Sequence, residues 1–184
     1  MGGFPCCCEA CPYCEAIVDS FDSALSGDWS QIRGTWATAG GVLECDDSNG
    51  QVIWYGQRPC SPKMVVICNL GAVGDGQTVY VITNYGSGNT NTGAESGYLF
   101  AKITQIGVLF DVSIGEVPSD GGTENILDSV TGLASFSGYL KLCYDSDVGK
   151  LSLINSSAFG ATSLLEGWPT LAYVKGRRAG LGLG

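Results

Sequence analysis

Short apolar runs separated by turn residues follow one another along most of the chain, and this spacing constrains the fold more than any other feature. The runs are rich in Val, Ile, Leu, Tyr, Phe and Trp and recur at intervals of roughly 8–15 residues, as in β-sandwiches and barrels. No segment keeps a helical period of about 3.6 residues through three turns. The sequence therefore predicts an all-β protein, a two-sheet antiparallel β-sandwich. The expected strands are residues 17–21, 29–32, 35–39, 42–45, 51–55, 63–70, 78–84, 97–104, 107–113, 139–144, 150–155 and 172–175.

Glycine and polar residues fill the gaps between these runs. Glycine makes up 28 of 184 residues, about twice its usual share, and its spread along the chain indicates many tight turns. The longest polar gap is residues 85–93, and loops held by a rigid sheet often carry recognition. Tyr85, Asn89 and Asn91 are therefore candidate ligand-binding residues, with an ordered loop of no function as the alternative. Trp168 is a further candidate, because an indole in the loop Glu-Gly-Trp-Pro could be exposed for stacking.

The charge pattern excludes several classes of partner. The formal net charge is −9, there is no histidine, and the nine Lys and Arg residues are scattered. A phosphate backbone or an anionic membrane surface would be repelled, so nucleic acid is not an expected partner. No apolar run approaches the roughly 20 residues of a spanning helix, so membrane insertion is not expected either. The N-terminus has no visible signal peptide, so we expect either retention in the cell until release or a chain that starts after a removed leader.

Five of the nine cysteines lie close together near the N-terminus. Cys8, Cys11 and Cys14 are separated by two-residue gaps, which let neighbouring thiolates converge on one zinc ion or iron–sulfur centre. Cys60 is the candidate fourth ligand, because it stands in a Pro-flanked loop. A strong zinc signature has two Cys-x-x-Cys pairs, and this chain has one cluster only. A tail knotted by disulfides is therefore an alternative, and free thiols or inter-chain bridges are a third.

The other cysteines are candidates for disulfides. Cys68 and Cys143 lie inside apolar runs, where they would be small buried hydrophobic residues or would pair across the sandwich. Because the total is odd, at least one cysteine stays unpaired if all the others are bridged within the chain. The disulfide candidates are Cys6, Cys7, Cys45, Cys68 and Cys143.

The turn at residues 46–50 is rich in side-chain oxygens. Calcium binds several oxygen ligands, so Asp46, Asp47 and Asn49 are candidate calcium ligands. A plain hydrogen-bonded turn is the alternative. The sequence thus leaves zinc and calcium open as metal cofactors and requires neither.

A series of aromatic and glycine motifs provides a family resemblance. It comprises Asp-Ser-Phe-Asp at 19–22, Leu-Ser-Gly-Asp-Trp at 25–29, Gly-Thr-Trp at 34–36 and Gly-Val-Leu at 41–43. Later motifs keep a similar order, with Gly-Val-Leu-Phe-Asp at 107–111, Tyr-Leu-Lys-Leu at 139–142 and Ala-Gly-Leu-Gly at 179–182. The chain resembles the concanavalin A-like, or laminin-G-like, jelly-roll superfamily. These motifs specify a fold more than an activity.

The resemblance implies a jelly-roll domain over residues 16–184, preceded by a short Cys-rich tail at residues 1–15. In that superfamily a last strand commonly follows the closing Gly-x-Gly and pairs beside the first strand. Because the chain ends soon after this motif, we expect a sheet edge that is open or filled by another polypeptide. Trp29, Trp36 and Trp54 are expected in the core, since each indole can bury roughly 150–250 Å².

A catalytic function is not expected. Retaining glycosidases of this superfamily need two carboxyl groups about 5 Å apart, and the expected Glu-x-Asp-x-x-Glu spacing is absent. A glycoside hydrolase would require a carboxylate pair assembled from distant segments. Serine or cysteine catalysis with a histidine base is excluded by the absence of histidine.

Two non-enzymatic functions remain. The first is a structural or assembly protein of a virion or cell surface, because low charge, clustered cysteines and an open edge suit contacts with other protein chains. That function implies a homo-oligomer or larger assembly with an extracellular or virion location. The alternative is a carbohydrate-binding, lectin-like adhesion module that uses Trp168 and the 85–93 loop to bind glycans. The sequence favours the assembly function narrowly.

Overall fold

The computed structural model describes residues 19–54, 64–71, 73–86, 97–117, 122–136, 138–158, 160–170 and 178–184. Within these ranges every regular element is a β-strand, so the predicted all-β class is confirmed. No described segment forms a helix that could cross a membrane. The strands are β1 (Trp29–Arg33), β2 (Trp36–Ala39), β3 (Val42–Cys45), β4 (Gln51–Trp54), β5 (Met64–Asn69), β6 (Thr78–Tyr85), β7 (Tyr98–Ile106), β8 (Leu109–Val117), β9 (Asn125–Leu133), β10 (Tyr139–Asp145), β11 (Lys150–Ile154), β12 (Leu165–Gly167) and β13 (Arg178–Leu183).

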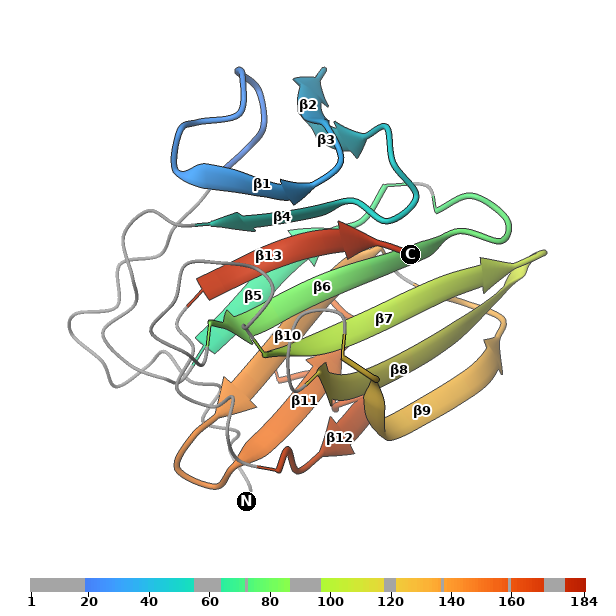
Figure 1. Ribbon diagram of the computed structural model, residues 1–184. Coiled ribbons are helices and arrows are strands. Elements are labelled where there is room, and N and C mark those ends of the chain that lie inside the picture. Colours follow the sequence, from blue (N-terminus) through green and yellow to red (C-terminus); the bar gives the residue numbers. More distant parts are fainter. Residues whose placement is uncertain are drawn as a thin grey trace.

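Two sheets form the sandwich. The larger has seven strands in the order β1-β4-β13-β6-β7-β8-β9, and the smaller has four in the order β12-β11-β10-β5. All strand pairs are antiparallel. In Figure 1 the seven-stranded sheet lies in front of the smaller sheet. β2 and β3 form a separate hairpin joined by Gly40 and Gly41, whose φ angles of 58° and 80° suit the tight turn of a two-residue loop.

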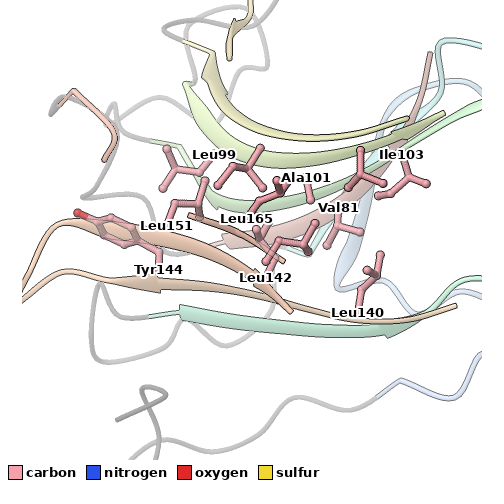
Figure 2. Packing of buried hydrophobic residues seen from close by; sticks show 12 residues of the cluster. Val81, Leu99, Ala101, Ile103, Leu140, Leu142, Tyr144, Leu151 and Leu165 are labelled. Carbon is pink, nitrogen blue, oxygen red and sulfur yellow. The ribbon is translucent and has the colours of Figure 1, made fainter. Parts of the chain in front are cut away.

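The core fills the space between the two sheets and is mainly aliphatic. Alternation along β6 and β7 sends one side chain in two toward the smaller sheet, and Figure 2 shows these side chains meeting the leucines of β10 and β11. Burial of each such side chain contributes roughly 1.5–3 kcal/mol. The core consists of Val81, Leu99, Ala101, Ile103, Val112, Ile114, Leu140, Leu142, Tyr144, Leu151, Leu153 and Leu165.

The expectation that the tryptophans are buried holds for Trp36, which is 6% exposed, but not for Trp29, which is half-buried. Neither belongs to the core between the sheets. Trp36 is buried but donates its Nε1–H to the carbonyl oxygen of Arg33 at 2.9 Å, and Trp29 donates to Asp19 Oδ2 at 2.8 Å. An indole N–H requires a hydrogen-bond acceptor when buried. Both tryptophans have this acceptor near β1 and not between the two sheets. The side chain of Trp54 lies outside the described part.

Most predicted strands are present, and three strands were missed. Residues 19–21 of the expected first strand are not in a strand, and residues 172–175 lie outside the described residues. The missed strands are β9, β12 and β13. β9 has aliphatic residues that do not alternate regularly, because its pairing with β8 shifts register twice. β12 has three residues, and β13 contains two glycines, which weaken a strand pattern.

β13 contains the closing Gly-x-Gly motif and is not at an edge of the sheet. β13 pairs with β4 on one side and with β6 on the other, so it lies inside the seven-stranded sheet. Its glycines fit this place, because a Cβ at Gly180 would lie 2.3 Å from Ile53 Cδ1. The crowded face therefore requires a residue without a side chain. The predicted tail at residues 1–15 and its boundary lie outside the described residues, so the domain division stays a prediction.

Candidate functional site

The outer face of the seven-stranded sheet carries aromatic rings. Val81 and Leu99 point into the core, so alternation places Tyr80 on β6, and Tyr98 and Phe100 on β7, on the opposite face. The rings of Tyr80 and Phe100 lie 5.7 Å apart, and those of Phe100 and Tyr98 lie 6.4 Å apart, both at 66°. This is the edge-to-face geometry that aromatic pairs prefer.

A bulge in β6 brings a fourth ring to this face. Asn84 has a φ of 54°, and the register between β6 and β13 shifts at this point. The irregularity places Tyr85 in one cluster with Ile82, where its ring stacks on Tyr98 at 6.0 Å and 24°. Asparagine adopts left-handed conformations at lower cost than most residues, and its Oδ1 accepts a hydrogen bond from Thr83 Oγ1 at 3.0 Å. We name the four rings of Tyr80, Phe100, Tyr98 and Tyr85 the aromatic row.

A shallow groove lies against the aromatic row. Its internal volume of about 160 Å³ is smaller than the roughly 300–1,000 Å³ of pockets that enclose drug-sized ligands. A bound molecule would therefore remain partly in solvent. The lining residues are Arg33, Asn49, Gly50, Gln51, Tyr80, Ile82, Tyr98, Val117, Gly122, Glu124, Gly182, Leu183 and Gly184.

Backbone without side chains forms part of the groove wall. The backbone N–H of Leu183 donates to the carbonyl oxygen of Gly50 at 2.7 Å, and the backbone N–H of Gly184 donates to the carbonyl oxygen of Thr78 at 3.2 Å. A Cβ at Gly184 would lie 2.8 Å from the ring of Tyr80. The glycines therefore leave the ring of Tyr80 accessible from this side.

Polar side chains stand along the groove beside β1 and β4. Arg33 is exposed, and its Nη2 donates to the buried Gln51 Oε1 at 3.3 Å. Asn49 is exposed in the turn before β4, and its backbone N–H donates to Asp47 Oδ1 at 2.9 Å. The groove therefore offers a guanidinium and two amides, which together donate and accept several hydrogen bonds.

Glu124 lies across the groove and is held by two partners from the sheet. Tyr80 Oη donates to Glu124 Oε1 at 2.5 Å, and Lys102 Nζ donates to Oε2 at 2.9 Å. The Lys102 ammonium also lies 5.4 Å from the centre of the Tyr80 ring. Burial and the hydrogen bond to Glu124 raise the pKa of Tyr80. Burial lowers the pKa of Lys102, but the hydrogen bonds to Glu124 and Tyr80 outweigh it, so that pKa is also raised.

This arrangement can hold a molecule that has an apolar face and polar edges. Rings offer a flat apolar surface, while the amide, guanidinium and carboxylate groups offer hydrogen bonds in several directions. Among the described lining residues, Glu124 is the sole carboxylate. The paired carboxylates that both classes of glycosidase require are therefore absent from the described groove.

Of the four predicted ligand-binding residues the structure describes two, Tyr85 and Trp168, which belong to different sheets. Trp168 is 62% exposed, as expected for a ring in that loop, but it follows β12 of the smaller sheet. Tyr85 is fully buried in the aromatic row, so it supports the surface instead of contacting a ligand directly. Asn89 and Asn91 lie outside the described residues.

The predicted calcium turn is held by its own hydrogen bonds. Asp46 Oδ1 accepts the backbone N–H of Thr35 at 2.8 Å, and Asp47 Oδ1 accepts that of Asn49 at 2.9 Å. No group of three or more metal-binding side chains occurs in the described ranges. The calcium site at Asp46, Asp47 and Asn49 therefore stays a prediction.

The described cysteines form no disulfide with one another. Cys68 lies in β5 and Cys143 in the neighbouring β10 of the same sheet, so the pairing across the sandwich is wrong. Cys68 packs against the core, and burial raises the pKa of its thiol to about 12. Cys143 is buried, as predicted for a small hydrophobic residue.

The remaining cysteine predictions are untested. Cys45 is a free, half-buried thiol beside Gly34 and Gly50. The other candidates, for zinc, an iron–sulfur centre or a disulfide, lie outside the described residues: Cys6, Cys7, Cys8, Cys11, Cys14 and Cys60.

The solved structures that this chain is similar to include a carbohydrate-binding module. It is the carbohydrate-binding module CBM66 from Bacillus subtilis, with a TM-score of 0.49, 9% sequence identity and coverage of 85% of this chain and 86% of that chain. The likeness concerns the arrangement of strands. No protein-family model and no curated protein matches the sequence. Membership of the concanavalin A-like superfamily therefore stays a prediction.

Sequence reasoning missed the groove. Arg33, Gln51, Tyr80 and Glu124 come from separate parts of the chain, so no local motif joins them. One signal was available, because Tyr80 and Tyr98 each begin an alternation of large apolar residues, Tyr-x-Ile and Tyr-x-Phe. Large apolar side chains on both faces of a strand indicate that the second face is covered or binds something.

Proposed function

We propose that the protein is a non-catalytic carbohydrate-binding module whose site is the groove beside the aromatic row. The observation that carries the proposal is the lining of this groove, which sets Tyr80 and Tyr98 beside the polar groups of Arg33, Asn49 and Gln51. A sugar ring has a face rich in C–H groups and an edge of hydroxyl groups. The first suits an aromatic surface, and the second suits guanidinium and amide partners.

The shape of the groove supports an open mode of binding. Because its volume is small, we expect it to hold one or two sugar rings of a longer chain, with the remainder in solvent. Glu124 is held by Tyr80 and Lys102, so it serves as a fixed acceptor for a hydroxyl group. Catalysis would need a second carboxyl group near it.

The test is a glycan array of plant, microbial and animal oligosaccharides, followed by calorimetry with the strongest binder. Arg33→Ala and Asn49→Ala change exposed side chains and should each weaken binding about tenfold, which corresponds to one lost hydrogen bond to a charged or polar group. Lys141→Ala is the matched control, because it removes a cation from the smaller sheet and should bind as wild type does. If the protein binds no glycan on the array, either with or without calcium, the proposal is wrong.

The assembly function expected from the sequence depended in part on a sheet edge left open by a strand after the Gly-x-Gly motif. The motif itself lies in β13, between β4 and β6, and the described residues do not test that edge. An oligomer and a virion or cell-surface location remain predictions. Light scattering under reducing and non-reducing conditions tests them, and a monomer in both would count against assembly.

A further inference from the structure

Trp168 is the one aromatic residue among the large, strongly exposed apolar side chains of the described ranges. It directly follows β12, the edge strand of the smaller sheet, and its side chain is 62% exposed. The ring is not part of the groove beside the aromatic row, because Trp168 is not among the residues that line that groove.

The residues around Trp168 fix its backbone. Gly167 is buried against Leu127, and a Cβ at this glycine would lie 2.6 Å from the Leu127 Cβ. Pro169 is buried on the other side. The ring is therefore presented by a segment anchored immediately before and after it.

A buried carboxylate completes the anchor. Glu116 at the end of β8 is 2% exposed. It accepts the backbone N–H of Thr170 at 2.8 Å and the hydroxyl of Thr170 at 2.6 Å, and it also accepts from Asn125 Nδ2 at 2.8 Å. Hydrogen bonds to an ionised acceptor are stronger than neutral ones. The Trp168 loop is thus tied to the larger sheet as well as to β12.

An ion pair lies on the same face as the ring. Burial alternates from Leu165 to Pro169, which places Glu166 and Trp168 on the side away from the core. Glu166 Oε1 accepts a hydrogen bond from Lys150 Nζ on β11 at 3.1 Å. Hydrogen bonds from Lys150 and Ser163 hold the pKa of Glu166 below its usual value.

We propose that Trp168, with Glu166 and Lys150, forms a second carbohydrate-binding site on the smaller sheet. The ring would stack on the C–H face of a sugar, and the ion pair would bind its hydroxyl groups. Charged neighbours favour a hydroxyl-rich ligand over a protein, since stable protein interfaces deplete charged residues at their centre. The inference rests on the proposed function and deepens it, because two sites on different sheets allow one chain to bind two parts of a glycan surface with avidity.

The test runs the same glycan array with wild type, Trp168→Ala, Glu116→Gln and the groove variant Arg33→Ala. Trp168→Ala should lose at least about tenfold in signal on glycans that the groove variant still binds. Glu116→Gln keeps the ring but weakens its anchor, so it should lose part of that signal and leave Trp168 more accessible to acrylamide quenching. Val108→Ser, which changes a side chain that is 83% exposed in the β7–β8 turn, is the control and should bind as wild type does.

The outcomes separate the two proposals. If Trp168→Ala gives the wild-type binding profile while Arg33→Ala loses signal, the second site is overturned and the groove stands. If Arg33→Ala has no effect while Trp168→Ala abolishes binding, the second site stands and the groove is overturned. A wild-type protein that binds no glycan on the array overturns both.

Discussion

The ring of Tyr85 stacks on the ring of Tyr98 with centroids 6.0 Å apart. The two residues belong to neighbouring strands, and the contact exists because the bulge at Asn84 places Tyr85 on the outer face. Without the bulge, strict alternation would send the ring of Tyr85 toward the core. One backbone irregularity therefore extends the aromatic row.

Asn84→Val should destabilise the protein. A β-branched residue tolerates a φ of 54° poorly, and the valine also removes the acceptor of the Thr83 hydroxyl. We expect the free energy of unfolding to fall by about 2–4 kcal/mol, measured by urea denaturation. Asn84→Gly keeps the backbone freedom and should lose about 1 kcal/mol. Equal stability of the two variants would show that the left-handed conformation is not required.

Gly115→Ala should disturb the support of the aromatic row. The added methyl group would lie 2.6 Å from Phe100 Cζ and 2.5 Å from the carbonyl oxygen of Asn125. Overpacking of this kind typically costs about 1–3 kcal/mol, so thermal unfolding should shift downward by several degrees. Gly27→Ala is the matched control, because nothing lies within 4 Å of its added Cβ. An unchanged melting temperature for Gly115→Ala would contradict the packing.

Alkaline pH should weaken the folded state through Tyr80. Its pKa is raised above the ordinary 10.0 by burial and by the hydrogen bond to Glu124, so the folded chain holds this proton more tightly than the unfolded chain. The resulting stabilisation is complete below pH 10 and is lost as pH rises through the folded pKa. Lys102, whose pKa is also raised, contributes with the same sign.

Melting temperatures of wild type and Tyr80→Phe between pH 8 and 11.5 test this dependence. The wild-type curve should fall more steeply above pH 10, since the variant lacks the titrating hydroxyl. Tyr144, whose pKa burial also raises, titrates in both proteins and gives a common background. Parallel curves would contradict the assignment.

The Cys68 thiol should resist alkylation in the folded protein. Burial raises its pKa to about 12, and the thiolate is the reactive form. Iodoacetamide at pH 8 should therefore leave Cys68 unmodified, whereas the denatured chain should be labelled there, as measured by peptide mass spectrometry. Rapid labelling of Cys68 under native conditions would show that β5 does not shield it.

The fold class could be predicted because strand signals are local. The apolar alternation from Tyr98 onward and the Gly40-Gly41 turn between β2 and β3 depend on residues close together in sequence. β9 and β13 could not be predicted in the same way. The aliphatic residues of β9 do not alternate regularly, because its pairing with β8 shifts register twice. β13 is central because its glycines fit a crowded face, which depends on Ile53 far away in sequence.

The sequence alone determined that apolar and polar residues alternate along strands, that the net charge is negative and that no histidine is present for catalysis. Only the tertiary structure decided which faces those strands bury and which residues gather at the groove. Arg33, Tyr80 and Glu124 lie far apart in sequence, and they line one groove because the larger sheet orders its strands by pairing and not by chain position. The pairing of β13 with β4 and β6 joins strands that are far apart in sequence, so no local turn or repeat encodes it.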